Sequence, residues 1–450
     1  MDAFALSAHG VVFLRMGGRP LEVVTLIIML LVILVAARLA GEASERFGQP
    51  AIIGELLAGI ILGPTLLGFL DPLSLPPEDL MKVVLDVVST LAIFFVVFYA
   101  GLEMSVKDLT SAVCGKGLYF AVGSFVVTFL AGYATGFYFM QDHVGASFLG
   151  LCVAITALPV SIKLLADLGR LHTRTGNAII GTAMVQDIIA ITVLSILIGL
   201  NVKIGHATPF TILMMVMKIT IFLLLIFALE RSFHIKDGWL AGKLTATMSK
   251  VKSKEGQFSI AVIVAMYFAV IAEFLGLSYI IGAFYGGLIF SKFAVGEMNF
   301  AAIKRGTSGI AMGFFAPIFI CYIGLMFNLR ELLPILGMFL VVLIVAVVSM
   351  FGSGYLGARM AGYNEKEARI IGVGINTRGM MEMVVALVGY NYGFIDKNFF
   401  SILVGMALVT TMVTPSLLKY LYARLPEEKA ASAEEREEQI LKEMREWLKG

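Results

Sequence analysis

Apolar residues in this chain form long runs that are separated by short polar stretches. A helix needs about 20 mostly apolar residues to cross a bilayer, and this criterion predicts about thirteen spanning helices. The runs lie near 21–41, 51–70, 80–104, 116–140, 145–168, 174–200, 208–230, 257–274, 277–293, 305–328, 332–360, 367–393 and 398–422. We therefore predict an all-α polytopic membrane protein whose two termini lie on opposite sides of the membrane.

The composition supports a membrane protein and argues against several other classes. Of the 450 residues, 59% are hydrophobic and only 15% are charged, whereas soluble domains average about 45–50% and 25%. The net charge is only +2, and without a long basic tract no nucleic-acid partner is expected. Cys114, Cys152 and Cys321 are too far apart to suggest a disulfide framework or a metal site. No catalytic constellation is visible, so we expect a protein that is not an enzyme and has no cofactor.

Positive charges predict the orientation. If the N-terminus is outside, most lysines and arginines fall in the inner connections, as the positive-inside rule requires. The outer segments then hold only Arg15, Arg19, Lys82, Lys203, Arg330 and Lys397. We expect an outside N-terminus and a cytoplasmic C-terminus in a bacterial-type cytoplasmic membrane. The run after Arg19 lacks a small-residue cleavage site, which favours a first membrane helix over a signal peptide.

The two halves of the chain resemble each other. "FYAGLEMSVKDL" at 98–109 is echoed by "CYIGLMFNLREL" at 321–332, and "IGELLAGIIL" at 53–62 by "IGAFYGGLIF" at 281–290, with nearly the same offset. Helices 1–6 therefore repeat as helices 8–13, with the helix near 208–230 as connector, and the copies have opposite orientations. Inverted repeats are typical of secondary transporters, whose sites lie near the midplane at broken helices.

Two helices in matching positions of the repeats contain signals for a break. Helix 5 reads "LCVAITALPVSIKLL", in which Pro159 lacks an N–H and disfavours helix at the residue before it. Helix 12 reads "IGVGINTRGMMEMVV", with Asn376, Thr377 and Arg378 polar at depth. We expect two crossed, interrupted helices, because irregular backbone in a membrane is tolerated where protein buries it or where it lines a cavity.

The sixth run contains Gln186 and Asp187 inside "AMVQDIIAITVL". An ionisable residue at mid-membrane is by default a functional candidate. Asp187, the Gln186 carbonyl and the Thr156 hydroxyl would form an all-oxygen site that suits an alkali cation rather than zinc or copper. The sequence also allows a structural Asp187 that is paired with Arg378.

Other charged pairs lie four residues apart on predicted helices. Arg378 and Glu382 can pair on one face of helix 12, either as a structural ion pair or with Arg378 neutralising the crossed helix ends. Lys163 and Asp167 can pair in the same way at the inner end of helix 5.

Several ordered motifs together resemble the monovalent cation:proton antiporter-2 family over roughly 20–422. They are "GQPAIIGELLAGIILGPTLLG", "FYAGLEM", "VQDIIAI", "APIFICYIGLMF" and "GINTRGMMEMVV". The Gln186–Asp187 pair is similar to that of the potassium-efflux branch, which includes glutathione-gated systems. The resemblance implies a sodium/proton-antiporter-like fold, a homodimer surrounded by lipid, and elevator-type alternating access.

The resemblance also implies a division into domains. Residues 1–110 and 205–330 would form the panel or dimerisation domain, with the connector helix, and 111–204 and 331–424 the ion-transporting core. The glutathione-gated systems carry a nucleotide-binding domain after the last helix, where this chain has a short charged tail, 425–450. We expect such a regulatory domain to be missing or to be a separate protein.

Many electrogenic relatives carry a lysine in helix 11 where this chain has Ser349. One titratable carboxylate without that lysine predicts electroneutral one-for-one exchange of a cation for a proton. We expect K⁺ as the transported ion, with Na⁺ or Li⁺ as the alternative. An organic-ion transporter of inverted-repeat fold is a second alternative. A channel is disfavoured because no filter-like run of carbonyls is visible.

Overall fold

The computed structural model describes most of the membrane part of the chain. The described residues are 22–104 without 73, 77 and 78, 116–203 without 172, a few helical residues between 214 and 224, 253–290 and 297–424. Four two-residue strands are described before them: β1 (Ala5–Leu6) pairs antiparallel with β2 (Val12–Phe13), and β3 (Arg15–Met16) with β4 (Arg19–Pro20).

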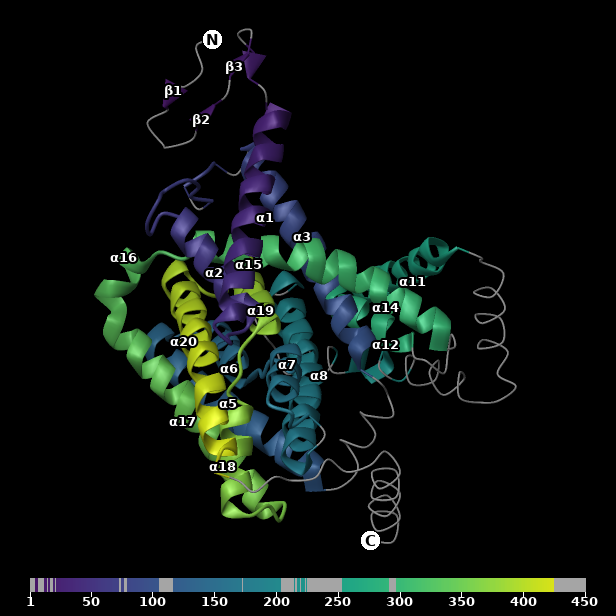
Figure 1. Ribbon diagram of the computed structural model, residues 1–450, viewed down its shortest axis with the longest axis vertical. Coiled ribbons are helices and arrows are strands. Elements are labelled where there is room, and N and C mark those ends of the chain that lie inside the picture. The colour runs from purple at the N-terminus through teal and green to yellow at the C-terminus, as the bar shows by residue number, and fades with distance from the viewer. Residues whose placement is uncertain are drawn as a thin grey trace.

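The described body is otherwise helical (Figure 1). In chain order the helices are α1 (Glu22–Arg46), α2 (Ala51–Leu62), α3 (Leu80–Glu103), α5 (Lys116–Met140), α6 (His143–Ala154), α7 (Leu158–Asp167), α8 (Arg174–Lys203), α11 (Lys254–Phe274), α12 (Tyr279–Ile289), α14 (Glu297–Ile310), the π-helix η1 (Ala311–Phe315), α15 (Ala316–Met326), α16 (Leu329–Leu332), the 3₁₀ turn η2 (Leu333–Ile335), α17 (Leu336–Met360), α18 (Glu365–Gly374), α19 (Met380–Asn391) and α20 (Lys397–Tyr422).

The prediction of a polytopic all-helical protein is confirmed. Among the described residues, nine helical segments are long and apolar enough to cross a membrane, and α2, α12 and α19 are shorter apolar helices. Every predicted run overlaps one to three successive helical elements of the described chain, except the seventh. That run, near 208–230, falls largely outside the described residues, as do Cys114 and the tail at 425–450.

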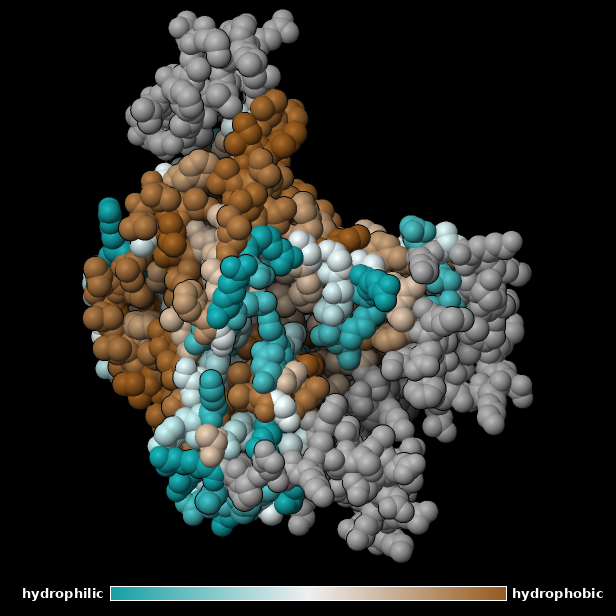
Figure 2. Space-filling view, in the orientation of Figure 1, coloured by the Kyte–Doolittle hydropathy of each residue, from teal (hydrophilic) through white to brown (hydrophobic). Residues whose placement is uncertain are grey.

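Two of the long helices are mostly exposed at the surface of the described chain. In the segment Val23–Arg46, which is α1, only 17% of an 18-residue apolar stretch is buried within the protein. In Leu329–Met360, which ends with α17, the buried share of such a stretch is 22%. In Figure 2 the apolar residues cover the upper and left parts of the view, where Figure 1 has α1 and α17, and polar residues gather at the lower end. These two helices therefore expose apolar residues at the surface of the chain.

Close glycine contacts show the repeat symmetry that the sequence predicts. A Cβ on Gly59 of α2 would lie 2.0 Å from the Cys321 carbonyl oxygen of α15. In the other copy, a Cβ on Gly287 of α12 would lie 2.3 Å from the Phe98 carbonyl oxygen of α3. Gly59 aligns with Gly287 in the repeat, and Cys321 with Phe98. The α2–α15 and α12–α3 contacts are therefore the same packing made twice.

The two predicted breaks also occur, and they meet. Residues 155–157 separate α6 from α7, and 375–379 separate α18 from α19. The Ala157 N–H donates to the Thr377 carbonyl at 2.8 Å, which joins the two interrupted segments. Helix α7 starts at Leu158 with Pro159 in its first turn, so the expectation that Leu158 itself is non-helical is wrong. A proline in the first turn loses no helical hydrogen bond, and the extended residues precede it.

The glycine contacts can be tested by adding one methyl group. We expect Gly59→Ala and Gly287→Ala each to lower the thermal midpoint of the purified protein, because the methyl group collides with backbone and the helices must separate. Such overpacking costs about 1–3 kcal/mol. The control is Gly123→Ala on the exposed face of α5, where a Cβ meets nothing within 4 Å. Equal midpoints for all three variants would contradict the close packing.

Candidate ion-binding site

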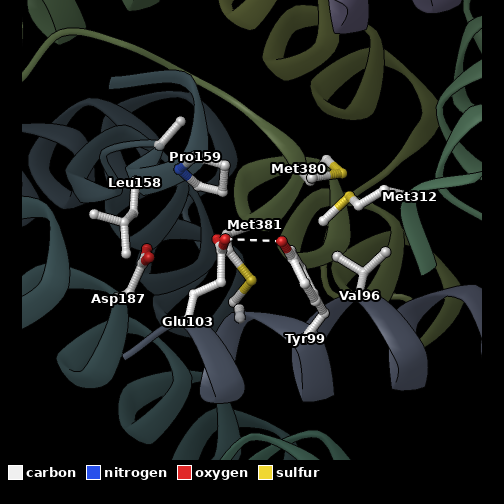
Figure 3. A pocket seen from close by; sticks show the side chains of 11 residues that line it. Val96, Tyr99, Glu103, Leu158, Pro159, Asp187, Met312, Met380 and Met381 are labelled. Carbon is white, nitrogen blue, oxygen red and sulfur yellow. Dashed lines mark hydrogen bonds between the residues drawn. The ribbon is translucent and has the colours of Figure 1, made fainter. Parts of the chain in front are cut away.

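Asp187 lies near the middle of the continuous helix α8 and is 2% exposed. Its Oδ1 has no hydrogen-bond partner among the described residues. The side chain lines a cavity of about 20 Å³ (Figure 3), which is enough for about one water-sized particle. Burial of an unpaired carboxylate is costly, so this position suits a group that is neutralised by a proton or a cation.

The cavity has two walls that come from different helices. Leu158 and Pro159, the first residues of α7, line it on the side of Asp187 (Figure 3), and Met380 and Met381, the first residues of α19, line it as well. Helix N-termini carry partial positive charge and favour a nearby carboxylate. The opposite wall consists of α3 and η1 and is lined by Val96, Tyr99, Ala100, Glu103 and Met312.

Gln186 and Thr156 lie close together, as predicted, but neither lines this cavity. The Thr156 Oγ1 lies 2.6 Å from the Gln186 Oε1 and 2.7 Å from the Ile375 carbonyl oxygen, and its single hydrogen can be donated to only one of them. The Gln186 Nε2 donates to the Ser124 Oγ at 2.9 Å. Both side chains are fully buried. Gln186 therefore contacts the first break through Thr156 and holds α8 to α5 through Ser124.

Arg378 is fully buried in the second break, and its Nη1 donates to the Cys152 and Ile155 carbonyl oxygens, each at 2.8 Å. These carbonyls lie at the C-terminal end of α6, where the helix dipole is negative. The Nε lies 4.0 Å from the Glu382 Oε2. The predicted Arg378–Glu382 pair is thus present but long, and Arg378 contacts the end of α6 rather than Asp187.

The remaining residues of the second break hold the crossing together. The Thr377 Oγ1 lies 2.6 Å from the Ser161 Oγ of α7. The Asn376 Nδ2 donates to the Gly372 carbonyl at 3.1 Å, while its Oδ1 has no partner among the described residues. The polar side chains of both breaks therefore bond to backbone carbonyls and to side chains of the neighbouring helices α7 and α8.

Two predicted positions are placed differently from the expectation. Ser349 is half-buried on α17, and its hydroxyl donates to the Ala346 carbonyl of its own helix at 3.4 Å. The α17 hydroxyl that reaches the core network is Ser353, 3.3 Å from the Thr128 Oγ1. Lys163 forms an ion pair with Glu45 of α1, so the predicted Lys163–Asp167 pair is wrong.

Sequence reasoning missed Ser124 and Thr128 of α5, which extend the network from Gln186. Their spacing of four residues in an apolar run was a usable signal, because it places two hydroxyls on one helix face. Within the described part of the chain, no group of three or more His, Cys, Asp or Glu side chains could hold a metal ion. In the structure, one carboxylate, Asp187, provides the charge on its wall of the cavity.

The roles of Arg378 and Glu382 can be separated. We expect Arg378→Ala to lower the thermal midpoint and the transport rate more than Glu382→Gln, because it leaves both the α6 carbonyls and Glu382 without a positive partner. Removing one member of a buried ion pair costs about 3–5 kcal/mol. A double-mutant cycle measures the coupling between the two side chains. Similar losses in both single variants, with recovery in the double variant, would show a simple ion pair instead.

Comparisons with known proteins identify the family of the chain. Residues 26–424 match the sequence model of a protein family whose description is "Sodium/hydrogen exchanger, transmembrane". The chain is 30% identical over 393 residues to the Na⁺/H⁺–K⁺ antiporter GerN of Bacillus cereus, covering 87% of this chain and 94% of that protein. It is 26% identical to a Na⁺/H⁺ antiporter of Enterococcus hirae, covering 87% and 97% of the two chains. The sodium proton antiporter MjNhaP1 from Methanocaldococcus jannaschii has a similar fold, with a TM-score of 0.70 at 16% identity over 91% of this chain and 100% of that one.

Proposed function

Because the chain belongs to the sodium/hydrogen exchanger family, we propose that it is a secondary antiporter that exchanges a monovalent alkali cation for protons. The observation that carries this proposal is the buried Asp187 carboxylate, which has an unpartnered oxygen in a cavity of about 20 Å³. Such a group is stable in an apolar setting when either a proton or a cation neutralises it. One site with two mutually exclusive occupants couples the two fluxes.

Alternating access requires that the ion site move relative to a second surface. The contacts between helices support, as a proposal, a division into a panel domain and an ion-transporting core. Within the core ranges, polar bonds are dense around the crossed breaks. Polar contacts between the panel ranges and the core ranges include two examples. The Ser278 N–H donates to the Ser195 Oγ at 2.9 Å, and Lys163 forms an ion pair with Glu45. Around the cavity the facing residues are mostly apolar. Apolar surfaces can slide without leaving bonds unpaired, which favours an elevator-type movement of the core.

We propose K⁺ as the favoured cation on the basis of the Gln186–Asp187 pair, with Na⁺ or Li⁺ as the alternative. One relative is named as a Na⁺/H⁺–K⁺ antiporter and another as a Na⁺/H⁺ antiporter, so these names support either ion. The potassium-efflux branch, the homodimer and the cytoplasmic C-terminus stay predictions. If organic cations competed with the flux better than K⁺ and Na⁺, the second alternative, an organic-ion transporter, would replace the proposal.

Asp187→Asn tests the proposal directly. The amide keeps the shape of the side chain but cannot exchange a proton for a cation, so we expect cation-driven proton flux in proteoliposomes to fall to the level of empty liposomes. The protein should remain folded, as judged by its elution profile and thermal midpoint. Asp167→Asn on the exposed side of α7 is the matched control and should transport normally. Normal flux in Asp187→Asn would exclude Asp187 as the exchanging group.

The occupancy model also predicts the electrical and pH behaviour. The loaded core carries the same net charge with a proton as with a cation, whereas each additional charge moved would contribute about 2.3 kcal/mol per 100 mV. We expect transport rates that do not change with imposed potential. A steady current on a solid-supported membrane would show that a second charge moves.

Lowering the pH should raise the half-saturating cation concentration without changing the maximal rate, because protons and cations compete for Asp187.

A further inference from the structure

The cavity contains a second carboxylate, on the wall that faces Asp187. Glu103 is the last residue of α3, and its Oε1 accepts a hydrogen bond of 2.8 Å from the Tyr99 hydroxyl. Figure 3 shows the Glu103 carboxylate between Asp187 and Tyr99. The Glu103 side chain is 17% exposed, whereas Asp187 is 2% exposed. Glu103 therefore lies closer to water than Asp187 along the same cavity.

A tethered cation already occupies the Glu103 carboxylate. The Lys304 Nζ of α14 lies 3.4 Å from the same Oε1, and the Lys304 side chain is 39% exposed. An ammonium group carries the same charge as an alkali ion and sits on a flexible four-carbon stem. A partly exposed ion pair of this kind contributes little stability, about 0–1 kcal/mol. An incoming cation can therefore displace Lys304 from Glu103 at a modest cost.

We propose that Glu103 is a second cation-binding group on the path to Asp187, and that Lys304 is a built-in competitor that occupies Glu103 when no cation is present. This inference rests on the proposed function and deepens it, because it names the residues that set the cation affinity on one face. Tyr99 keeps the carboxylate oriented while the ammonium and the cation exchange places. The competitor raises the cation concentration at which transport from this face begins.

The two residues should act in opposite directions. In everted membrane vesicles, in which the predicted cytoplasmic face is outside, added K⁺ or Na⁺ dissipates an imposed pH gradient that a fluorescent dye reports. We expect Lys304→Gln and Lys304→Met to lower the half-saturating cation concentration about threefold, and Glu103→Gln to raise it by a similar factor. Lys304→Gln in the Glu103→Gln background should have no further effect, because no carboxylate remains to be blocked.

Controls separate this role from a structural one. Arg305→Gln removes the same charge from the next, exposed position and should leave the half-saturating concentration unchanged, and Lys304→Arg should stay close to wild type. A purely structural ion pair would give the same direction of change in Glu103→Gln and Lys304→Gln, together with a lower thermal midpoint in both. A change in the same direction in both variants overturns the inference. So does an unchanged half-saturating concentration in the Lys304 variants, or an equal shift in Arg305→Gln. Asp187→Asn is tested in the same vesicles. Normal transport by Asp187→Asn would mean that the proposed function fails, whereas an inactive Asp187→Asn with unchanged Lys304 variants would mean that only this inference fails.

Discussion

A carboxylate buried inside a membrane helix must be compensated, and most of the arrangement around Asp187 follows from that constraint. The first turns of α7 and α19 point their partial positive charges into the cavity that Asp187 lines. Interrupting two helices creates those positive ends, but it also creates two negative ends. Arg378 binds the carbonyls at the end of α6, and the Thr156 hydroxyl lies 2.7 Å from the Ile375 carbonyl that follows α18. The crossed breaks are thus one electrostatic unit, and the Asp187 carboxylate lies beside it with an unpartnered oxygen.

The rest of the fold holds this unit against a second surface. The contacts around Gly59 and Gly287 bring backbone against backbone, so α2, α15, α3 and α12 cannot shift easily relative to one another. The hydroxyl network from Gln186 to Ser124 likewise holds α8 to α5. Between these two tightly bonded parts lies the cavity, whose walls are mostly apolar. Rigid parts that meet at an apolar surface would allow the proposed movement of Asp187 without unfolding of its surroundings.

Much of this could be predicted because its signals are local in the sequence. Run length predicts the helices, Pro159 and the polar residues 376–378 predict the breaks, and two echoed segments predict the repeats. The partners of individual side chains could not be predicted, because they depend on how distant helices pack. Lys163 was expected to pair within its own helix, yet it reaches Glu45, 118 positions earlier in the chain. Ser353 rather than Ser349 reaches the core network, a difference of one helical turn that only the packing of α17 decides.

In the proposed exchange, one proton and one alkali cation compete for the Asp187 carboxylate. The most direct measurement is proton release on cation binding, recorded by pH electrode or calorimetry with purified protein in weakly buffered detergent solution. Competition for one carboxylate predicts that K⁺ or Na⁺ releases close to one proton per protein chain at saturation, and that Asp187→Asn releases none. Release of two protons per chain, or undiminished release from Asp187→Asn, would contradict competition at Asp187.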